Sequence, residues 1–269
     1  MNKLEIIIVS LLLTNVFLLN KLWFTSRPFI QQIEQQPIVL SPNKRIDYRN
    51  EWIEEMSQVF QKYGTDKYHH GYHNLYGSFL GSRKHDRMNI LEIGLGCGMS
   101  YGPGKSLLAW KEYFSNSTIS IFEYNRDCAE KFRTQVAHLF IGDQSNFDDL
   151  KQVNSGGPYD VIIDDGGHSR KQMIHSLIGL FPLLKNGGVY VIEDLWFAYT
   201  KESNDYKKSM VDVIGELIRG FSVLGLNGNT PFDKIPELDI SISDDLNYVA
   251  NNVFSISCFR RACALVKKS

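Results

Sequence analysis

The sequence predicts an α/β fold in which a mostly parallel β-sheet ends in an antiparallel hairpin. Short aliphatic segments alternate with amphipathic segments after residue 89, and the last two aliphatic segments lie only a few residues apart. Strands that alternate with helices form βαβ units, and these units build parallel sheets with helices on both faces.

Five aliphatic segments are typical of buried parallel strands. They cover residues 90–93, 118–122, 137–141, 160–163 and 189–192. The apolar periodicity between them predicts helices over residues 105–114, 127–135, 147–153 and 169–184. Residues 253–258 and 262–266 leave no room for a crossover helix, so they should pair as an antiparallel hairpin. Parallel strands closed by such a hairpin are typical of the class I methyltransferase version of the Rossmann-like sheet.

The chain before the sheet divides into three parts. Residues 1–24 contain a mostly aliphatic or aromatic run, residues 6–24, which we interpret as a single-pass membrane anchor, with a cleaved signal peptide as the alternative. Residues 25–45 hold three prolines and no apolar period, which predicts a linker. Residues 48–62 have helical periodicity and predict an N-terminal helical extension of the folded domain, residues 46–269.

Composition and charge limit the classes of molecule that the protein can bind and indicate where its folded domain lies. The 269 residues, 43% of them hydrophobic, are enough for one sizeable core. Because 29 lysines and arginines face 30 acidic residues, no positive field is available to hold nucleic acid. Positive charge stands near the end of the apolar run at Lys21 and after it at Arg27, which predicts that the folded domain lies on the cytosolic side of the membrane. Cleavage of the run would instead send the protein into the secretory pathway.

The four cysteines show no metal-binding spacing. Cys97, Cys128, Cys258 and Cys263 form no CxxC pair and have no histidine partner at zinc-finger spacing. We therefore expect neither a zinc site nor a disulfide framework, and interpret them as small buried or half-buried side chains. Cys258 and Cys263 flank the predicted hairpin turn and could face each other.

A glycine-rich loop, GLGCGMSYGPGK, follows the first predicted strand. Gly94, Gly96 and Gly98 stand at alternate positions, where glycine lets the backbone turn out of the strand and approach a ligand closely. This G-x-G-x-G spacing differs from the G-x-G-x-x-G pattern of dinucleotide-binding proteins.

Polar residues end the next two strands. Glu123 ends the second strand, where a carboxylate accepts hydrogen bonds from a ribose diol. Asp143 and Gln144 end the third, at the edge where an adenine would lie. Together with the glycine loop, these residues predict a site for one extended nucleoside-containing cofactor.

The fourth and fifth strands end in IIDDGGHS and VIEDL. Ligands collect at the carboxyl ends of parallel strands, so Asp165, Glu193 and Asp194 should converge. Carboxylates packed together repel one another unless a cation shares them, and oxygen ligands select Mg²⁺, Ca²⁺ or Mn²⁺ over zinc. The alternative is that Asp164 or Asp165 caps the following helix.

One histidine stands beside these acids. His168 lies three residues after Asp165, and the ordinary histidine pKa of about 6.5 suits a general base. Five other histidines lack such neighbours and are interpreted as structural: His69, His70, His73, His138 and His175.

Six motifs occur in a fixed order: YGTDK, LEIGLGCG, the glycine-rich insert before SLLAWKEYF, GDQ, DDGGH and GGVYVIEDL. Over residues 63–194 they resemble the macrocin/mycinamicin-type sugar O-methyltransferases, whose relatives include proteins named cephalosporin hydroxylase. The resemblance implies a domain that binds S-adenosyl-L-methionine (SAM) and a Mg²⁺ site. On matching positions, Asp165, Glu193 and Asp194 are implied as metal ligands and His168 as the base.

The resemblance also places part of the YGTDK motif over the cofactor. The expected cofactor-binding residues are Tyr63, Thr65, Asp66, Glu92, Gly94, Gly96, Gly98, Glu123, Asp143 and Gln144. Two positions depart from the family's pattern, since Gly167 stands where serine is usual and Glu123 where aspartate is commoner. Neither change removes a needed functional group.

The implied activity is Mg²⁺-assisted, SAM-dependent O-methylation of a small-molecule hydroxyl on a sugar or polyol. An NAD(P)-dependent oxidoreductase is one alternative, because a glycine loop and a strand-end acid would serve its cofactor too; the glycine spacing, GDQ and the terminal hairpin speak against it. A membrane-tethered SAM-binding protein without turnover is the other, although the retained base and acids argue against it.

Overall fold

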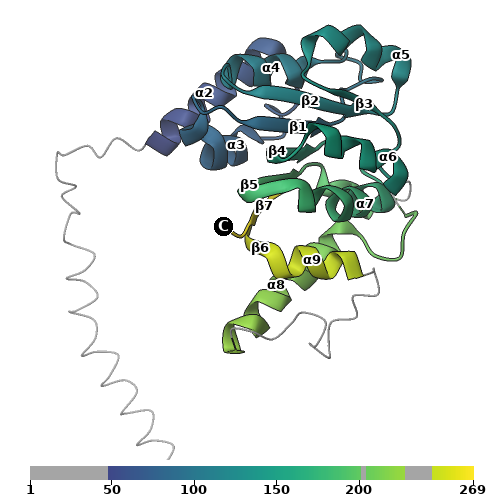
Figure 1. Ribbon diagram of the computed structural model, residues 1–269. Coiled ribbons are helices and arrows are strands. Elements are labelled where there is room, and N and C mark those ends of the chain that lie inside the picture. Colours follow the sequence, from purple (N-terminus) through teal and green to yellow (C-terminus); the bar gives the residue numbers. More distant parts are fainter. Residues whose placement is uncertain (1–47, 201–203, 228–243) are drawn as a thin grey trace, which may run out of the picture. The chain divides into compact units, whose positions relative to one another are not determined.

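The computed structural model describes residues 48–200, 204–227 and 244–269, within a unit that spans residues 47–269. Its strands are β1 (Asn89–Ile93), β2 (Thr118–Glu123), β3 (Leu139–Ile141), β4 (Tyr159–Asp164), β5 (Leu184–Ile192), β6 (Val253–Phe259) and β7 (Ala262–Lys267). They form one seven-stranded sheet in the order β3-β2-β1-β4-β5-β7-β6. Strands β1 to β5 pair in parallel, and β7 runs antiparallel to β5 and β6. Figure 1 follows the sheet from β3 to the yellow hairpin, and the predicted fold class is confirmed.

Helices pack on both faces of the sheet and form two separate apolar clusters. One cluster takes side chains from α2 (Tyr48–Tyr63), α3 (His73–Leu80) and α4 (Lys105–Tyr113). The other takes them from α6 (Phe147–Lys151), α7 (Arg170–Leu180), α8 (Met210–Asn227) and α9 (Asp244–Asn252). Strand β4 supplies both clusters, because Val161 and Ile163 join the first and Ile162 the second.

Several elements differ in length from their predictions. The helix expected over residues 169–184 ends at Leu180, because Pro182 has no N–H to continue it. Strand β5 begins at Leu184, which pairs with Tyr159 of β4. The helices after β2 and β3 are short: α5 (Arg126–Ala129) and α6 each continue into a 3₁₀ turn, η2 (Glu130–Gln135) and η3 (Gln152–Gly156). The other 3₁₀ turns are η1 (Gly81–Arg83), η4 (Phe181–Leu183) and η5 (Leu195–Tyr199).

The strand register brings the predicted acidic residues to one edge. Asp164 pairs with Ile93 of β1 on one side and with Ile192 of β5 on the other. The N–H of Asp165 donates to Ile93 O at 3.1 Å, and the N–H of Glu193 donates to Asp164 O at 3.0 Å. The residues after β1, β4 and β5 therefore leave the sheet side by side.

The predicted membrane anchor, residues 1–24, and the linker, residues 25–45, lie outside the described residues and stay predictions. Among the helices that are described, none is both long and apolar enough to cross a membrane.

Candidate active site

The loop after β1 depends on glycine. Gly94 has a φ of +93°, and a Cβ there would lie 2.1 Å from the carbonyl oxygen of Asp165. Gly96 and Gly98 also have positive φ, at 72° and 119°. These conformations cost glycine little, and they let the loop turn away from β1 close to the loop after β4.

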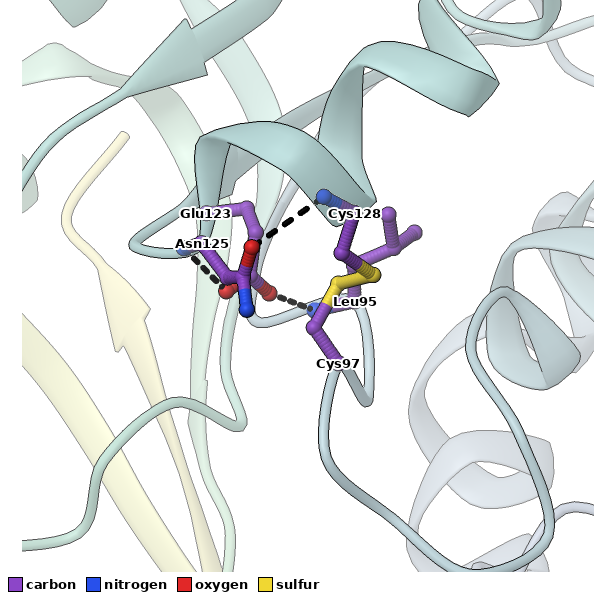
Figure 2. Close-up of a disulfide and its surroundings, with 5 residues drawn as sticks. All are labelled: Leu95, Cys97, Glu123, Asn125 and Cys128. Carbon is purple, nitrogen blue, oxygen red and sulfur yellow. Dashed lines mark hydrogen bonds between the residues drawn. A yellow bond between two sulfur atoms is a disulfide. The ribbon is translucent and has the colours of Figure 1, made fainter.

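Glu123, the last residue of β2, is fixed beside this loop. Its carboxylate accepts the N–H of Leu95 through Oε2 and the N–H of Asn125 through Oε1, both at 2.8 Å. The residue is 7% exposed, and Figure 2 shows it held between the loops that follow β1 and β2. Each oxygen keeps a second lone pair for a ligand hydroxyl.

The cysteines correct the expectation of unpaired thiols. Cys97 in the glycine loop is bonded to Cys128 in α5, as Figure 2 shows, and Cys258 is bonded to Cys263 across the β6–β7 turn. The first bridge was missed because its cysteines are 31 residues apart. They meet because β1 and β2 are neighbours, so the loops that follow them lie side by side.

A pocket of about 260 Å³ opens at the carboxyl ends of the strands. Among its lining residues are Asp66, Gly94, Gly96, Glu123, Gln144, Asp165, His168 and Asp194. The structure therefore brings predicted cofactor residues, predicted metal ligands and the predicted base to one cavity. Glu123 and the glycine loop belong to the part beside β2, whereas the acids and the histidine follow β4 and β5.

The residues of the GDQ motif do not all line the same hollow. The side chain of Gln144 is buried and bridges two elements, because its Nε2 donates to Asp164 Oδ1 at 3.0 Å and its Oε1 accepts the N–H of Gly167 at 2.8 Å. Gln144 thereby supports the loop after β4 and also lines the pocket. Asp143 lines a neighbouring hollow instead, and its Oδ1 accepts the N–H of Ser145 at 2.8 Å.

Four more of the predicted cofactor residues are not among those that line this pocket: Tyr63, Thr65, Glu92 and Gly98. Tyr63 donates its hydroxyl to Glu112 Oε2 at 2.6 Å, and Thr65 Oγ1 accepts the N–H of Lys67 at 3.4 Å. The carboxylate of Glu92 is fully buried and accepts a hydrogen bond from Trp110 Nε1 at 3.0 Å. Burial raises the pKa of Glu92 to about 7.

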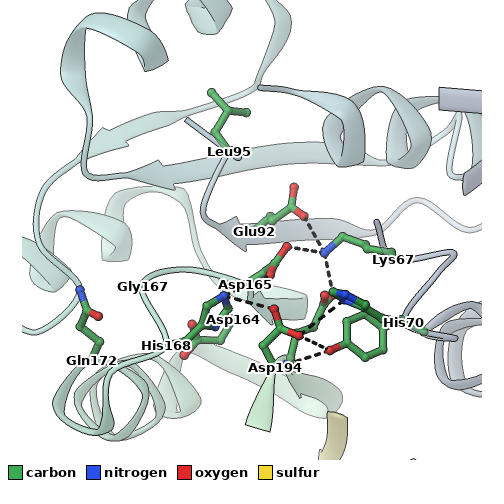
Figure 3. Close-up of polar contacts among 12 residues, drawn as sticks. Lys67, His70, Glu92, Leu95, Asp164, Asp165, Gly167, His168, Gln172 and Asp194 are labelled. Atoms are coloured by element: carbon green, nitrogen blue, oxygen red, sulfur yellow. Dashed lines mark hydrogen bonds and ion pairs between the residues drawn. The ribbon is translucent and has the colours of Figure 1, made fainter. Parts of the chain in front are cut away.

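Asp165, His168 and Asp194 form a compact group. His168 Nε2 lies 3.7 Å from Asp165 Oδ1 and 3.5 Å from Asp194 Oδ2. One ligand atom from each residue can be chosen so that all lie within 4.8 Å of one another, and Figure 3 shows the three side chains turned toward one point. The two carboxylates fit a divalent cation such as Mg²⁺, and the imidazole lies beside the point that they share.

Backbone geometry and packing hold this group in place. His168 and Asp194 both have left-handed backbone conformations, with φ of 59° and 54°. The imidazole of His168 stacks on Phe197, with ring centroids 5.0 Å apart. The alternative role of Asp164 or Asp165 as a helix cap is excluded, because Ser169 caps α7 in a capping box with Gln172.

Glu193 points elsewhere, although it directly precedes Asp194. Its Oε1 lies 2.7 Å from Lys67 Nζ and accepts the hydroxyl of Tyr76. Lys67 is 1% exposed and also lies 2.6 Å from Asp165 Oδ2. Burial alone would lower the pKa of Lys67, but the carboxylates of Asp165 and Glu193 raise it well above its ordinary value.

Sequence reasoning missed Lys67, Tyr72 and His70 as parts of this site. Tyr72 donates its hydroxyl to Asp194 Oδ1 at 2.5 Å, and His70 Nδ1 lies 3.6 Å from the same oxygen. All three belong to the stretch YGTDKYHHGYHNLY, whose aromatic and histidine content was the available signal. Their partners follow β4 and β5, about 100 residues or more further along the chain.

The fold is that of class I methyltransferases. The MycE methyltransferase of the mycinamycin pathway, solved with Mg, SAH and mycinamycin VI, superposes with a TM-score of 0.63 at 23% identity. The superposition covers 79% of this chain and 54% of that one. A second crystal form of MycE, with Mg and SAH, gives a TM-score of 0.66 at 24% identity over 79% and 53% of the two chains. These structures establish the architecture.

Curated relatives agree with the resemblance of the motifs, which is thereby confirmed, although no protein-family model matches the chain. Demethylmacrocin O-methyltransferase of Streptomyces fradiae is 32% identical over 152 residues, which are 54% of this chain and 37% of the relative. Mycinamicin VI 2''-O-methyltransferase of Micromonospora griseorubida gives the same values. L-olivosyl-oleandolide 3-O-methyltransferase of Streptomyces antibioticus is 35% identical over 151 residues, 54% and 38% of the two chains. The matched segment spans less than half the length of each relative.

Proposed function

We propose that this protein is a SAM-dependent O-methyltransferase that acts on a hydroxyl of a small molecule, a sugar or polyol. One observation carries the proposal: a single pocket joins Glu123 and the glycine loop to the group of Asp165, His168 and Asp194. The first part suits a nucleoside cofactor and the second suits an acceptor hydroxyl. The names of the relatives, which are O-methyltransferases of sugar-bearing compounds, support the same activity.

The cofactor would extend from Glu123 toward the acids. The carboxylate of Glu123 is already oriented by two backbone N–H groups, so it can accept the ribose hydroxyls without rearrangement. Gly94 and Gly96 allow the backbone to approach the ligand closely. Gly142 and Gln144 line the same pocket and are the residues of GDQ that would meet the adenine.

Asp165 and Asp194 would hold the divalent cation, Mg²⁺ by preference, because both present a carboxylate oxygen to the same point. When bound, such a cation lowers the pKa of a ligating hydroxyl and orients the acceptor. Glu193, which the resemblance adds to the ligands, is held by Lys67 and Tyr76 and would have to leave them to join the cation.

His168 would act as the general base. Its Nε2 faces the carboxylate oxygens where the acceptor would lie, and Phe197 fixes the plane of the ring. The acceptor oxygen attacks the methyl carbon, the carbon–sulfur bond of SAM breaks, and S-adenosylhomocysteine (SAH) leaves as a neutral thioether. The proton of the acceptor hydroxyl passes to Nε2, which matters most for alcohols because they are weak acids.

A cation that binds two oxygens of one molecule favours acceptors with neighbouring hydroxyl groups.

We propose in addition that residues 6–24 tether the protein to a membrane, as the apolar run indicates.

Ligand binding and product analysis test the activity. In calorimetry, the full chain should bind SAH and not NADH, because the G-x-G-x-G loop lacks the dinucleotide spacing. Methyl-labelled SAM incubated with a glycan and lipid extract should give a labelled product, and a chelator should abolish it. Preference for NADH would contradict the proposal in favour of an oxidoreductase. SAH binding without any labelled product would favour a binding protein.

A further inference from the structure

Tyr72 makes two hydrogen bonds to one residue of the candidate cation group. Its hydroxyl donates to Asp194 Oδ1 at 2.5 Å and accepts the backbone N–H of Asp194 at 3.1 Å. The ring is 1% exposed. A single hydroxyl thus fixes both the carboxylate of Asp194 and its left-handed backbone.

The two oxygens of Asp194 have different neighbours. Oδ1 faces Tyr72 and His70, whereas Oδ2 lies 3.5 Å from His168 Nε2. The hydrogen bond from Tyr72 therefore turns Oδ2 toward the point that Asp165 and His168 share. Figure 3 shows this arrangement around Asp194.

The two carboxylate oxygens of Asp165 also have different neighbours. Its Oδ2 lies 2.6 Å from Lys67 Nζ, and its Oδ1 faces His168. Lys67 and Tyr72 are themselves joined, because the N–H of Tyr72 donates to Lys67 O at 2.9 Å. One short segment between α2 and α3 therefore binds the carboxylate oxygen that points away from His168 in each residue, Oδ1 of Asp194 and Oδ2 of Asp165.

We infer that Tyr72 is a positioning residue for the divalent cation: its hydroxyl orients Asp194 so that Oδ2 is ready to bind the ion. The inference rests on the proposed function, since it assumes a cation at this group. Partners of this kind, which orient a metal ligand from behind, typically change metal affinity about 10- to 100-fold when they are removed.

The test compares two variants that each lose one buried hydroxyl. Tyr72→Phe removes the bond to Asp194. Tyr190→Phe is the matched control, because Tyr190 is equally buried and donates to Asp164 Oδ2 at 3.3 Å, outside the cation group. Mn²⁺ serves as the probe, its free concentration is read by electron paramagnetic resonance, and SAH affinity and the melting temperature are measured on the same samples.

We expect Tyr72→Phe to weaken Mn²⁺ binding about 10- to 100-fold, while Tyr190→Phe binds Mn²⁺ as the wild type does. SAH affinity should stay within about twofold in both, because Tyr72 does not line the pocket. Equal Mn²⁺ affinity in Tyr72→Phe and wild type would overturn the inference and leave the proposed function intact. An equal loss of Mn²⁺ affinity in Tyr190→Phe would also overturn it, since the loss would then come from general destabilisation of the fold and not from the orientation of Asp194. A wild-type protein without Mn²⁺ binding would overturn the cation site itself.

Discussion

His168 and Asp194 adopt left-handed backbone conformations, which few residues other than glycine adopt. Such strain persists where surrounding contacts hold it, and here Phe197 stacks on His168 while Tyr72 binds the N–H of Asp194. The turn at Asp194 directs its side chain away from that of Glu193, which lies against Lys67. The sequence indicates that the acids gather at one edge, but side-chain directions depend on these distant contacts.

Replacing His168 tests its role as the base. We expect His168→Ala to lower the rate of methyl transfer by about 10²- to 10⁴-fold, the usual contribution of a general base. SAH affinity should change little, because the imidazole lies beside the acids and not beside Glu123. Calorimetry and labelled-methyl transfer at saturating SAM measure the two quantities. His175→Ala is a suitable control, since His175 contacts Ser145 O and Phe147 outside the pocket; full activity of His168→Ala would remove it as the base.

The parallel strands and the terminal antiparallel hairpin follow from the sequence, because aliphatic segments separated by amphipathic ones indicate βαβ units and the last two aliphatic segments leave no room for a helix. The glycine loop follows β1 and Glu123 ends β2, as the positions of the aliphatic segments predict. The bridge between Cys97 and Cys128 was not predicted, because it requires knowing that the loops after β1 and β2 touch. Lys67 was missed for the same reason, since its carboxylate partners come from other elements.

This bridge should matter for the cofactor. Replacing Cys97 and Cys128 by serine frees the glycine loop, and binding must then order it, so we expect SAH affinity to fall about 3- to 10-fold. Closing a loop of 31 residues also contributes about 3 to 4 kcal/mol to the free energy of unfolding. Calorimetry and urea unfolding measure both effects. The Cys258 and Cys263 double variant is the control, because that bridge lies at the hairpin turn; equal SAH affinity in both double variants would contradict the expectation.

Asp160, at the start of β4, joins three strands. Its carboxylate accepts the N–H of Asn89 at 2.8 Å and lies 2.7 Å from Lys185 Nζ and 3.0 Å from Arg83. Burial alone would raise the pKa of Asp160, but the hydrogen bonds from Lys185, Asn89 and Arg83 hold it below its ordinary value. The strand ends are therefore stabilised by an ionised carboxylate.

We expect Asp160→Asn to lower the free energy of unfolding at pH 7 by about 1 to 3 kcal/mol. Because the folded-state pKa is depressed, the stabilisation is complete above the unfolded value of about 3.9 and is lost as the pH falls through the folded pKa. The difference between variant and wild type should therefore shrink below about pH 4. Urea unfolding from pH 7 to pH 3 measures it. Asp86→Asn is the control, since Asp86 also binds Arg83 but is 55% exposed; a constant difference at all pH values would exclude the carboxylate as its source.

In the described part of the chain, one apolar cluster lies on each face of the sheet, and the segment matched in the relatives covers only part of this fold. Helices α8 and α9 lie outside the residues that carry the resemblance, yet they complete one apolar cluster together with α7. Their sequences gave no functional motif, because packing against a sheet requires only apolar periodicity.

The two disulfides set a requirement for maturation. Glutathione keeps thiols reduced in the cytosol, whereas disulfides persist in the secretory pathway. We therefore propose that the domain matures in the secretory pathway, which is the alternative to the cytosolic side indicated by the flanking charges.

Asn116 begins an Asn-Ser-Thr glycosylation sequon and is exposed, so glycosylation at Asn116 reports the compartment. In a eukaryotic host, we expect a glycosidase-sensitive band that is lost in Asn116→Gln, and no free thiols to alkylate; an unglycosylated protein with four reactive thiols would place the domain in the cytosol. A preparation from a reducing host would then contain the protein without the bond between Cys97 and Cys128, and assays on it would give a lower SAH affinity than the oxidised protein has.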